Sequence, residues 1–359
     1  MLHRTQSKTA QHILTYAQQL QGGGVERAML RMAAGWHAAG RRVTLVLGSS
    51  EGPLAAEIPG GIELIELGDG RHQALFRLAD EVRRARPDLL FCPGNNERRI
   101  QKALAAGADA VILDLEDSVH PDAKSQARAL VVRALAAERA GPVVARVNAE
   151  DTGWHLSDLA AILPARPDAI MLPKCDGPRA LQRLSDRLDA LEAAYGLPHR
   201  SISVLPLITE TALALADMAY AEATPRLAAL CFGAEDLAAD LGGDARDGRE
   251  MNPLLAHARL RVAITAAAAG VAAIGKPYPD PGRPDLLAAE AGQAFALGFA
   301  GKLCIHPDQI AAVHDAFRPA AARIAWARAT VDALGMSATG VAVVDGRMVD
   351  RAHLKLAYR

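Results

Sequence analysis

In the stretch 109-DAVILDLEDSV-119, a continuously apolar run passes directly into a cluster of acidic residues. A strand that is buried on both faces has an unbroken apolar sequence, whereas a half-exposed strand alternates. Seven further runs of this kind occur along the chain, separated by amphipathic segments rich in Ala, Leu and Arg. The eight predicted strands are 88–92, 109–115, 143–148, 168–173, 203–209, 227–233, 271–276 and 300–305.

Eight strands that alternate with helices predict a closed (β/α)₈ barrel of the TIM type. An open doubly wound sheet shares this alternation, and strand counting alone does not separate the two. Charged residues at the ends of the runs favour the barrel, in which all the C-terminal strand ends meet at one mouth. These residues are Asp114, Glu116, Asp117, Arg146, Lys174, Glu210 and Asp236.

The segments on either side of the barrel predict two additional parts. The first 87 residues contain a glycine turn, a helix (24–39), strands (42–47 and 61–67) and a second helix (72–85), which is typical of a small Rossmann-like α/β unit. After the barrel, two helices, a hairpin turning at Asp345-Gly346 and a final helix predict a lid. The predicted domains are therefore 1–87, 88–318 and 319–359.

Composition excludes several classes of protein. Half of the 359 residues are hydrophobic, and the net charge is −1, so a nucleic-acid or membrane-surface partner is not expected. No apolar run is long enough to span a bilayer. The four cysteines are far apart in the sequence and predict free thiols in a reducing compartment. The N-terminus lacks the Arg and Ser richness of a transit peptide, so a cytoplasmic protein is expected.

Eight motifs resemble the citrate lyase β-subunit-like, malyl-CoA and citramalyl-CoA lyase branch of the HpcH/HpaI aldolase superfamily. The resemblance implies a lyase that depends on Mg²⁺, or Mn²⁺ in its place. Such an enzyme cleaves a carbon–carbon bond of a 3-hydroxyacyl-CoA such as malyl-CoA or citramalyl-CoA to give acetyl-CoA and a 2-oxo acid, or forms the same bond in the reverse direction. The motifs are LLFCPGNNERRIQKA (89–103), AVILDLEDSV (110–119), ARVN (145–148), IMLPK (170–174), LITETALAL (207–215), GAEDLAADLG (233–242), GKLCIHPDQI (301–310) and GRMVD (346–350).

Glu210 and Asp236 are the predicted metal ligands. Mg²⁺ prefers oxygen ligands and usually takes only one or two protein carboxylates. The resemblance places both residues in metal-ligand motifs of the family. The residues alone leave an alternative open, in which both are helix N-terminal acids favoured by the helix dipole.

Arg146 is the predicted clamp for the thioester carbonyl or the enolate formed from it, because a guanidinium offers several donors in one plane. The alternative is a buried arginine that pairs with Asp114 or Glu116. The resemblance assigns these two carboxylates and Asp117 to orienting the arginine and a metal-bound water. Lys174, Glu210 and Arg146 are also predicted to bind substrate.

In GRMVD, Asp350 matches the lid aspartate that, in relatives, reaches the active site of a neighbouring subunit and protonates the enolate. The resemblance thus implies a homotrimer or hexamer with a shared lid. A surface turn aspartate is the alternative. The motif departs from the family at Arg351-Ala352, where a proline usually follows.

For CoA, the resemblance implies Phe91 at a strand end, Arg98 and Lys102 on the next helix, and the backbone at Leu303-Cys304. A solvated helix face is the alternative for the two cations. Two departures bear on acyl or CoA preference: Gly275 stands where relatives often have aspartate, and Pro87-Asp88 where many have Arg-Ser. The lone histidines His257 and His306 are interpreted as structural.

The segment GGGVERAMLRMAAGWHAAGRRVTLVL (22–47) resembles the N-terminal, acceptor-side half of family 4 glycosyltransferases, without a donor-binding half. Within the enzyme class, a citryl-carrier-protein lyase subunit and a malyl-CoA thioesterase remain alternatives. A fusion product or a non-catalytic binding protein is the alternative from another class.

Overall fold

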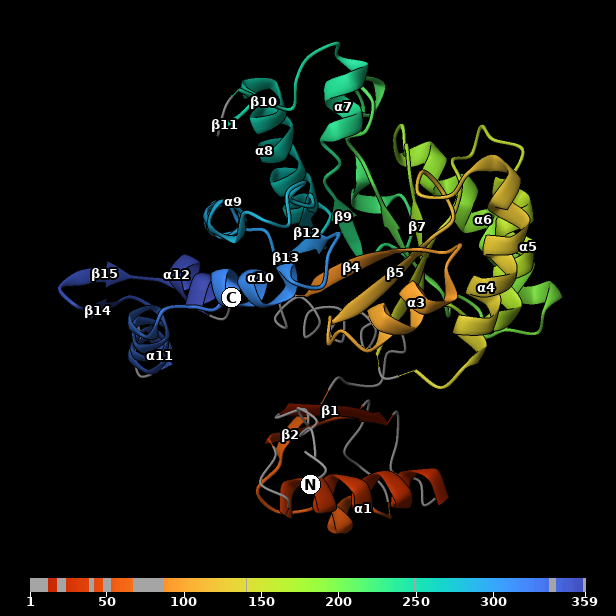
Figure 1. Ribbon diagram of the computed structural model, residues 1–359. Coiled ribbons are helices and arrows are strands. Elements are labelled where there is room, and N and C mark those ends of the chain that lie inside the picture. The colour runs from red at the N-terminus through yellow and green to blue at the C-terminus, as the bar shows by residue number, and fades with distance from the viewer. Residues whose placement is uncertain are drawn as a thin grey trace, which may run out of the picture. The chain divides into compact units, whose positions relative to one another are not determined.

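The computed structural model describes residues 12–17, 24–38, 42–47, 53–66, 87–139, 141–247, 250–335 and 340–357. The chain divides into two compact units, Met1–Glu81 and Val82–Arg359, and each is described by itself (Figure 1). The predicted division at residues 87 and 318 remains a prediction.

The second unit contains a barrel of eight parallel strands (Figure 1). The hydrogen-bonded order is β8-β7-β6-β5-β4-β13-β12-β9, and two bridges, Val204–Leu227 and Leu207–Cys231, join β8 to β9. These bridges close the sheet on itself, so the predicted barrel is confirmed and the open sheet is excluded. The strands are β4 (Asp88–Pro93), β5 (Ala110–Asp114), β6 (Val143–Arg146), β7 (Ala169–Leu172), β8 (Ser203–Pro206), β9 (Ala229–Cys231), β12 (Ala272–Gly275) and β13 (Gly301–Cys304).

Helices surround the strands, as Figure 1 shows for α4, α5 and α6 beside β5 and β7. Two of them begin at a capping asparagine: Asn96 accepts from the N–H of Arg99, and Asn252 from that of Leu254. The helices are α3 (Glu97–Leu104), α4 (Lys124–Ala136), α5 (His155–Ile162), α6 (Pro178–Ala194), α7 (Glu235–Asp240), α8 (Pro253–Ala268), α9 (Pro284–Ala296) and α10 (Gln309–Phe317), with a hairpin of β10 (Arg246–Asp247) and β11 (Glu250–Met251) before α8.

Residues along each strand alternate between two apolar layers. On β5, Ile112 points into the barrel interior with Val144 and Leu303, while Val111 and Leu113 pack in the layer between strands and helices. Because both faces are buried, the strand sequences are continuously apolar.

Gly301 lets β13 approach β4 closely. A Cβ at this position would lie 1.9 Å from the carbonyl oxygen of Pro87 and 3.3 Å from Ile274 Cδ1. Gly301→Ala must therefore separate the two strands, and we expect it to lower the free energy of unfolding by about 1–3 kcal/mol or more.

Urea denaturation measures this effect, and Gly292→Ala on α9 is the matched control. A Cβ at Gly292 meets nothing within 4 Å. Alanine there should stabilise the helix by about 0.5–1 kcal/mol. Equal midpoints for the two variants would contradict the close approach of β4 and β13.

The C-terminal segment forms α11 (Ala321–Gly335), a hairpin of β14 (Ala342–Val344) and β15 (Arg347–Val349), and α12 (Arg351–Ala357). The turn residues Asp345 and Gly346 both have positive φ, 49° and 72°, as a tight hairpin turn requires. Both β14 and α12 pack against α11. The predicted hairpin and final helix are confirmed.

The first unit contains α1 (Gly24–Ala38) and a parallel sheet of β1 (His12–Ala17), β2 (Arg42–Leu47) and β3 (Glu63–Glu66) in that order. The sequence analysis missed β1, because the strand depends on pairing with β2 rather than on a strong local pattern. The predicted helix 72–85 lies outside the described residues. Among the described residues, no helix is both long and apolar enough to cross a membrane.

Candidate active site

Arg146 lies at the mouth of the barrel and is held by carboxylates from the neighbouring strand. Its Nε and Nη2 donate to the two oxygens of Asp114 at 2.6 and 2.8 Å, and Nη1 lies 2.9 Å from Glu116 Oε2. Its Cζ is 4.9 Å from the ring centroid of Phe91 on β4. The pairing with Asp114 and Glu116 is therefore present, and it fixes the guanidinium plane against an aromatic face.

A backbone glycine positions this pair. The N–H of Gly94 donates to the carbonyl of Asp114 at 2.8 Å, and a Cβ on Gly94 would lie 2.6 Å from the same oxygen. Only glycine lets the loop after β4 approach the end of β5 so closely. Burial raises the pKa of Asp114, but the Arg146 charge more than offsets this and lowers it below the usual value.

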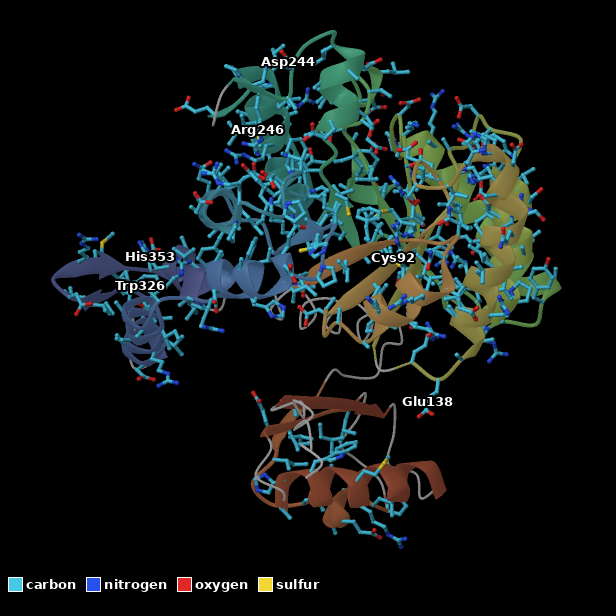
Figure 2. All side chains as sticks on the ribbon, in the orientation of Figure 1. Cys92, Glu138, Asp244, Arg246, Trp326 and His353 are labelled. Carbon is cyan, nitrogen blue, oxygen red and sulfur yellow. The ribbon has the colours of Figure 1, made fainter. Side chains whose placement is uncertain are left out.

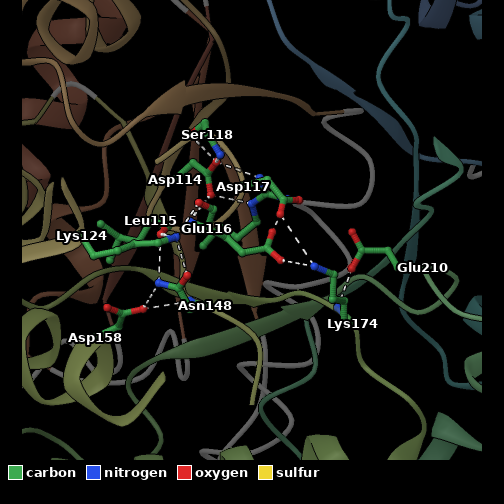
Figure 3. A network of polar contacts seen from close by, with 11 residues as sticks. Asp114, Leu115, Glu116, Asp117, Ser118, Lys124, Asn148, Asp158, Lys174 and Glu210 are labelled. Carbon is green, nitrogen blue, oxygen red and sulfur yellow. Dashed lines mark hydrogen bonds and ion pairs between the residues drawn. The ribbon is translucent and has the colours of Figure 1, made fainter. Parts of the chain in front are cut away.

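Lys174, after β7, links the acidic cluster to Glu210 (Figure 3). Its Nζ lies 3.0 Å from Glu116 Oε1 and 3.7 Å from Asp117 Oδ1. Its backbone N–H donates to Glu210 Oε2. The residue has φ 48°, a left-handed conformation that is uncommon outside glycine and here aims the N–H and the ammonium at two different carboxylates.

Glu210 and Asp236 come from neighbouring strand ends that are joined by hydrogen bonds. The hydroxyl of Thr209 donates to the carbonyl of Gly233 at 2.7 Å, and the N–H of Gly233 lies 2.9 Å from the same hydroxyl oxygen. A Cβ on Gly233 would lie 2.6 Å from Glu210 Cγ, so the Glu210 side chain packs directly on this backbone. Asp236 follows in the first turn of α7 and is half-buried.

The electrostatics of Glu210 indicate a site that lacks positive charge. Its side chain is only 3% exposed. Burial, and then the charges of Glu116 and Asp236, raise its pKa to about 8 although Lys174 and Arg146 act against them. Burial also raises the pKa of Glu116 to about 6. Five carboxylates thus face the cations of Arg146 and Lys174 and, from behind, that of Lys124, so negative charge is in excess, and the oxygen donors of Glu210 and Asp236 are of the kind that a divalent ion prefers.

Elsewhere in the described residues, two clusters bring three metal-ligating side chains within 4.8 Å of one another, Asp88–Asp109–His314 and Asp189–Glu192–His199, whereas the mouth contains no such group of three. The first lies at the start of β4, the opposite end of the barrel, and His314 Nε2 pairs with Asp88 Oδ1 at 2.7 Å. In the second, the Arg226 guanidinium already pairs with Asp189 and Glu192. The second cluster therefore contains its own protein cation, and in the first the histidine is already paired with a carboxylate.

The residues assigned to CoA are only partly available to a ligand. Phe91 is half-buried under Arg146, and Arg98 and Lys102 are exposed on α3. Leu303 and Cys304 are buried in the inner and outer apolar layers, respectively. Their side chains cannot contact CoA, so only the backbone of this pair remains as a candidate.

Asp350 caps the N-terminus of α12. Its Oδ1 accepts from the N–H of Ala352 at 2.9 Å and lies 2.8 Å from Nδ1 of His353. The same Nδ1 lies 3.2 Å from the backbone nitrogen of Asp350. These bonds lower the pKa of Asp350. Within the described residues its recorded contacts are all local, so a role as proton donor stays a prediction.

The four cysteines are all buried free thiols, as expected (Figure 2 labels Cys92 on β4). Burial raises the pKa of Cys92 to about 11 and that of Cys304 to about 12. Such thiols stay protonated at neutral pH and are unreactive.

Sequence reasoning missed three buried polar residues behind the site: Lys124, Asn148 and Asp158. Asn148 ends the quoted ARVN motif, but no function was inferred for it. Lysine and aspartate are rarely fully buried unless paired, yet the sequence gives no sign that Lys124 and Asp158 are buried.

Comparison with known proteins agrees with this architecture. The profile of the HpcH/HpaI aldolase/citrate lyase family matches residues 88–307. A citramalyl-CoA lyase, mitochondrial, of Rattus norvegicus is 32% identical over 285 residues, covering 75% of this chain and 83% of the relative. A (3S)-malyl-CoA thioesterase of Cereibacter sphaeroides is 36% identical over 277 residues, covering 75% and 91%.

Among solved structures, CitE of Mycobacterium tuberculosis in complex with magnesium, acetoacetate and coenzyme A superposes with a TM-score of 0.63 at 33% identity, covering 76% of this chain and 95% of CitE. RipC of Yersinia pestis gives a TM-score of 0.55 at 32% identity, covering 66% and 97%. The barrel, its strand-end carboxylates and these matches lead to one conclusion. This chain belongs to the HpcH/HpaI aldolase/citrate lyase family.

Proposed function

We propose that this protein is a Mg²⁺-dependent lyase that cleaves or forms the carbon–carbon bond of a 3-hydroxyacyl-CoA such as malyl-CoA or citramalyl-CoA. The observation that carries the proposal is the buried Glu210 carboxyl group, which accepts from the Lys174 N–H and lies in the same mouth as Asp236 and Arg146. Family membership and the citramalyl-CoA lyase and CitE relatives support it.

The residues of the mouth divide the chemistry between them. Glu210 and Asp236 would hold the ion, which would supply positive charge to the oxygens of the acyl group. Arg146 donates to the thioester carbonyl oxygen, where negative charge develops as the bond breaks. Asp114 and Glu116 fix its guanidinium, and Lys174 holds Glu116 from the other side.

The lid supplies a proton in this proposal. As the carbon–carbon bond breaks, the substrate hydroxyl releases its proton to solvent and becomes the oxo group of the 2-oxo acid, while the bonding electrons pass to the acetyl-CoA enolate. Asp350 of an adjacent subunit then protonates the carbon of this enolate, and acetyl-CoA and the 2-oxo acid leave. The capping bonds of Asp350 must then open when the lid closes, because they favour its ionised form.

A direct assay tests the proposal. Purified protein with Mg²⁺ is given malyl-CoA or citramalyl-CoA, and the products are identified by chromatography. The lyase releases acetyl-CoA with glyoxylate or pyruvate, whereas a thioesterase releases free CoA with an unbroken hydroxy acid. If acetyl-CoA forms from neither substrate, the lyase proposal is wrong.

The second candidate function is hydrolysis of malyl-CoA. A (3S)-malyl-CoA thioesterase has the higher identity of the two curated relatives described above. The same product analysis separates the two functions.

Stability should respond to Mg²⁺ in a pH-dependent way. The pKa of Glu210 is raised from 4.5 to about 8, so the metal-free folded protein keeps a proton that the unfolded chain releases. The stability contributed by this proton is present below pH 4.5 and is lost as the pH rises to about 8. Mg²⁺ replaces the proton, so we expect the ion to raise Tm more at about pH 8.5 than at about pH 6.

Differential scanning fluorimetry with and without Mg²⁺ measures the two shifts. Glu210→Gln removes the titrating group and should abolish the difference between the two pH values. A shift in the wild type that is independent of pH would place the ion elsewhere.

The proposal also includes the features that the family resemblance implies: a homotrimer or hexamer with a shared lid, a CoA face at Phe91, Arg98 and Lys102, and a cytoplasmic location. The mitochondrial location of one relative belongs to that protein. The domain division at residues 87 and 318, and the glycosyltransferase-like origin of residues 1–87, remain predictions.

A further inference from the structure

A buried lysine lies behind the acidic cluster of the mouth. Lys124 begins α4, and its side chain is among the buried charged groups, 5% exposed. Its Nζ donates at 2.7 Å to the carbonyl of Leu115, at 2.7 Å to the carbonyl of Glu116 and at 2.6 Å to Oδ1 of Asn148 (Figure 3). The three N–H bonds of the ammonium are thus all used, and two of them hold the backbone that carries the acids.

Asn148, two residues after β6, extends the contact with Lys124 into a bridge between the ends of β5 and β6. Its Nδ2 donates to the carbonyl of Leu115 at 2.9 Å and to Oδ2 of Asp158 at 2.6 Å. Asp158 on α5 is fully buried and also accepts from the Asn148 N–H at 2.9 Å. The ends of β5 and β6, which carry Glu116 and Arg146, are therefore tied together behind the mouth (Figure 3).

The charge of Lys124 also matches its surroundings. Burial lowers its pKa, while the charges of Asp114, Asp158 and Glu116 act in the opposite direction. Its Nζ also lies 5.2 Å from the ring centroid of Trp154, a cation–π contact. Lys124 thus adds positive charge near the acids to that of Arg146 and Lys174.

We infer that Lys124 is a positioning residue for catalysis, which acts through the backbone of Glu116 on the geometry of Arg146. This inference rests on the proposed function. Lys124 itself contacts no side chain to which that function assigns a contact with the substrate. Its two carbonyl bonds set the path of the chain at Glu116, whose carboxylate lies 2.9 Å from Arg146 Nη1 and 3.0 Å from Lys174 Nζ. A displaced Glu116 would remove one of the carboxylates that hold each of these two cations.

The test is Lys124→Met, which keeps the length of the side chain and removes its donors. A misplacement of about 1 Å in a catalytic group costs about a hundredfold in rate, so we expect kcat to fall about a hundredfold. KM for malyl-CoA or citramalyl-CoA should stay within about threefold, because Lys124 does not contact the ligand. Arg133→Met is the matched control, since Arg133 lies on the same helix and its ion pair with Glu97, at 3.9 Å, is exposed on both sides.

A double-mutant cycle separates positioning from simple stability. If Lys124 acts through Glu116, then Lys124→Met should cost less than about threefold in kcat in a Glu116→Gln background. A merely structural role would lower activity equally in both backgrounds, in proportion to the loss of folded protein. Equal losses for Lys124→Met and Arg133→Met, or full additivity in the cycle, would overturn the inference.

A crystal structure of Lys124→Met provides a readout that does not need activity. We expect the Glu116 carboxylate to move away from Arg146 while the strands of the barrel stay in place. Unchanged positions of Glu116 and Arg146 would contradict the inference, whatever the reaction is. Failure of the proposed function is recognised separately, because the wild type would then produce no acetyl-CoA.

Discussion

Glu210→Gln should reduce kcat/KM of the lyase reaction at least about a thousandfold at saturating Mg²⁺, because the variant loses one of the two carboxylates proposed to bind the ion. A divalent ion contributes several kcal/mol to transition-state stabilisation, and about 4 kcal/mol corresponds to a thousandfold in rate. Glutamine preserves the shape of the side chain against Gly233, so the fold should be retained. Steady-state kinetics and Mg²⁺ titration calorimetry measure both effects.

Glu235→Gln is the matched control for this experiment. Glu235 is the neighbour of Asp236 on α7, but it is exposed and pairs with Lys276 at 3.3 Å. Its replacement should change kcat/KM by less than about threefold, because Glu235 itself is 56% exposed and the buried Lys276 keeps Glu290 at 4.0 Å as a partner. Comparable losses in the two variants would mean that negative charge in general, and not ligation by Glu210, is required.

Arg146→Gln should have two separable consequences. Loss of the donors to the developing negative charge is expected to lower kcat about a hundredfold to a thousandfold. Asp114, which is 2% exposed, would also lose its partner, and breaking a buried ion pair from one side costs about 3–5 kcal/mol of stability. Arg146→Lys keeps the charge but not the paired bonds, so it should regain part of the stability and little of the activity.

Urea denaturation and kcat at a fixed Mg²⁺ concentration measure the two consequences. Arg139→Gln is the control, because Arg139 pairs with Asp168 at 2.6 Å, near the start of β7 and away from the mouth. It should leave kcat unchanged. If Arg146→Gln lost stability but kept kcat, the arginine would be a structural partner of Asp114 and not a clamp.

The barrel was predictable from the sequence because each of its strands is buried on both faces. The apolar runs around Ile112, Ile170 and Leu303 coincide with β5, β7 and β13, and one side of each strand faces the interior. The strand β1 was missed because HILTYA, a short mixed run, owes its conformation to the pairing with β2. Local patterns do not encode such non-local pairs.

The site was predictable where strand ends carry the charges. Asp114, Arg146 and Lys174 each follow an apolar run, and the parallel register places Asp114 beside Arg146. Lys124 could not be recognised, because it lies on a helix and its contacts depend on how α4 packs against β5. The burial of Leu303 and Cys304 likewise depends on packing, which sequence motifs do not specify.

The most direct test of the account is a crystal structure of the protein grown with Mn²⁺ in place of Mg²⁺ and with pyruvate, using anomalous scattering to locate the ion. We expect one anomalous peak at the barrel mouth, with oxygens of both Glu210 and Asp236 about 2.1 Å from it. A peak at Asp88–His314, or an ion that touches only one of the two carboxylates, would contradict the account.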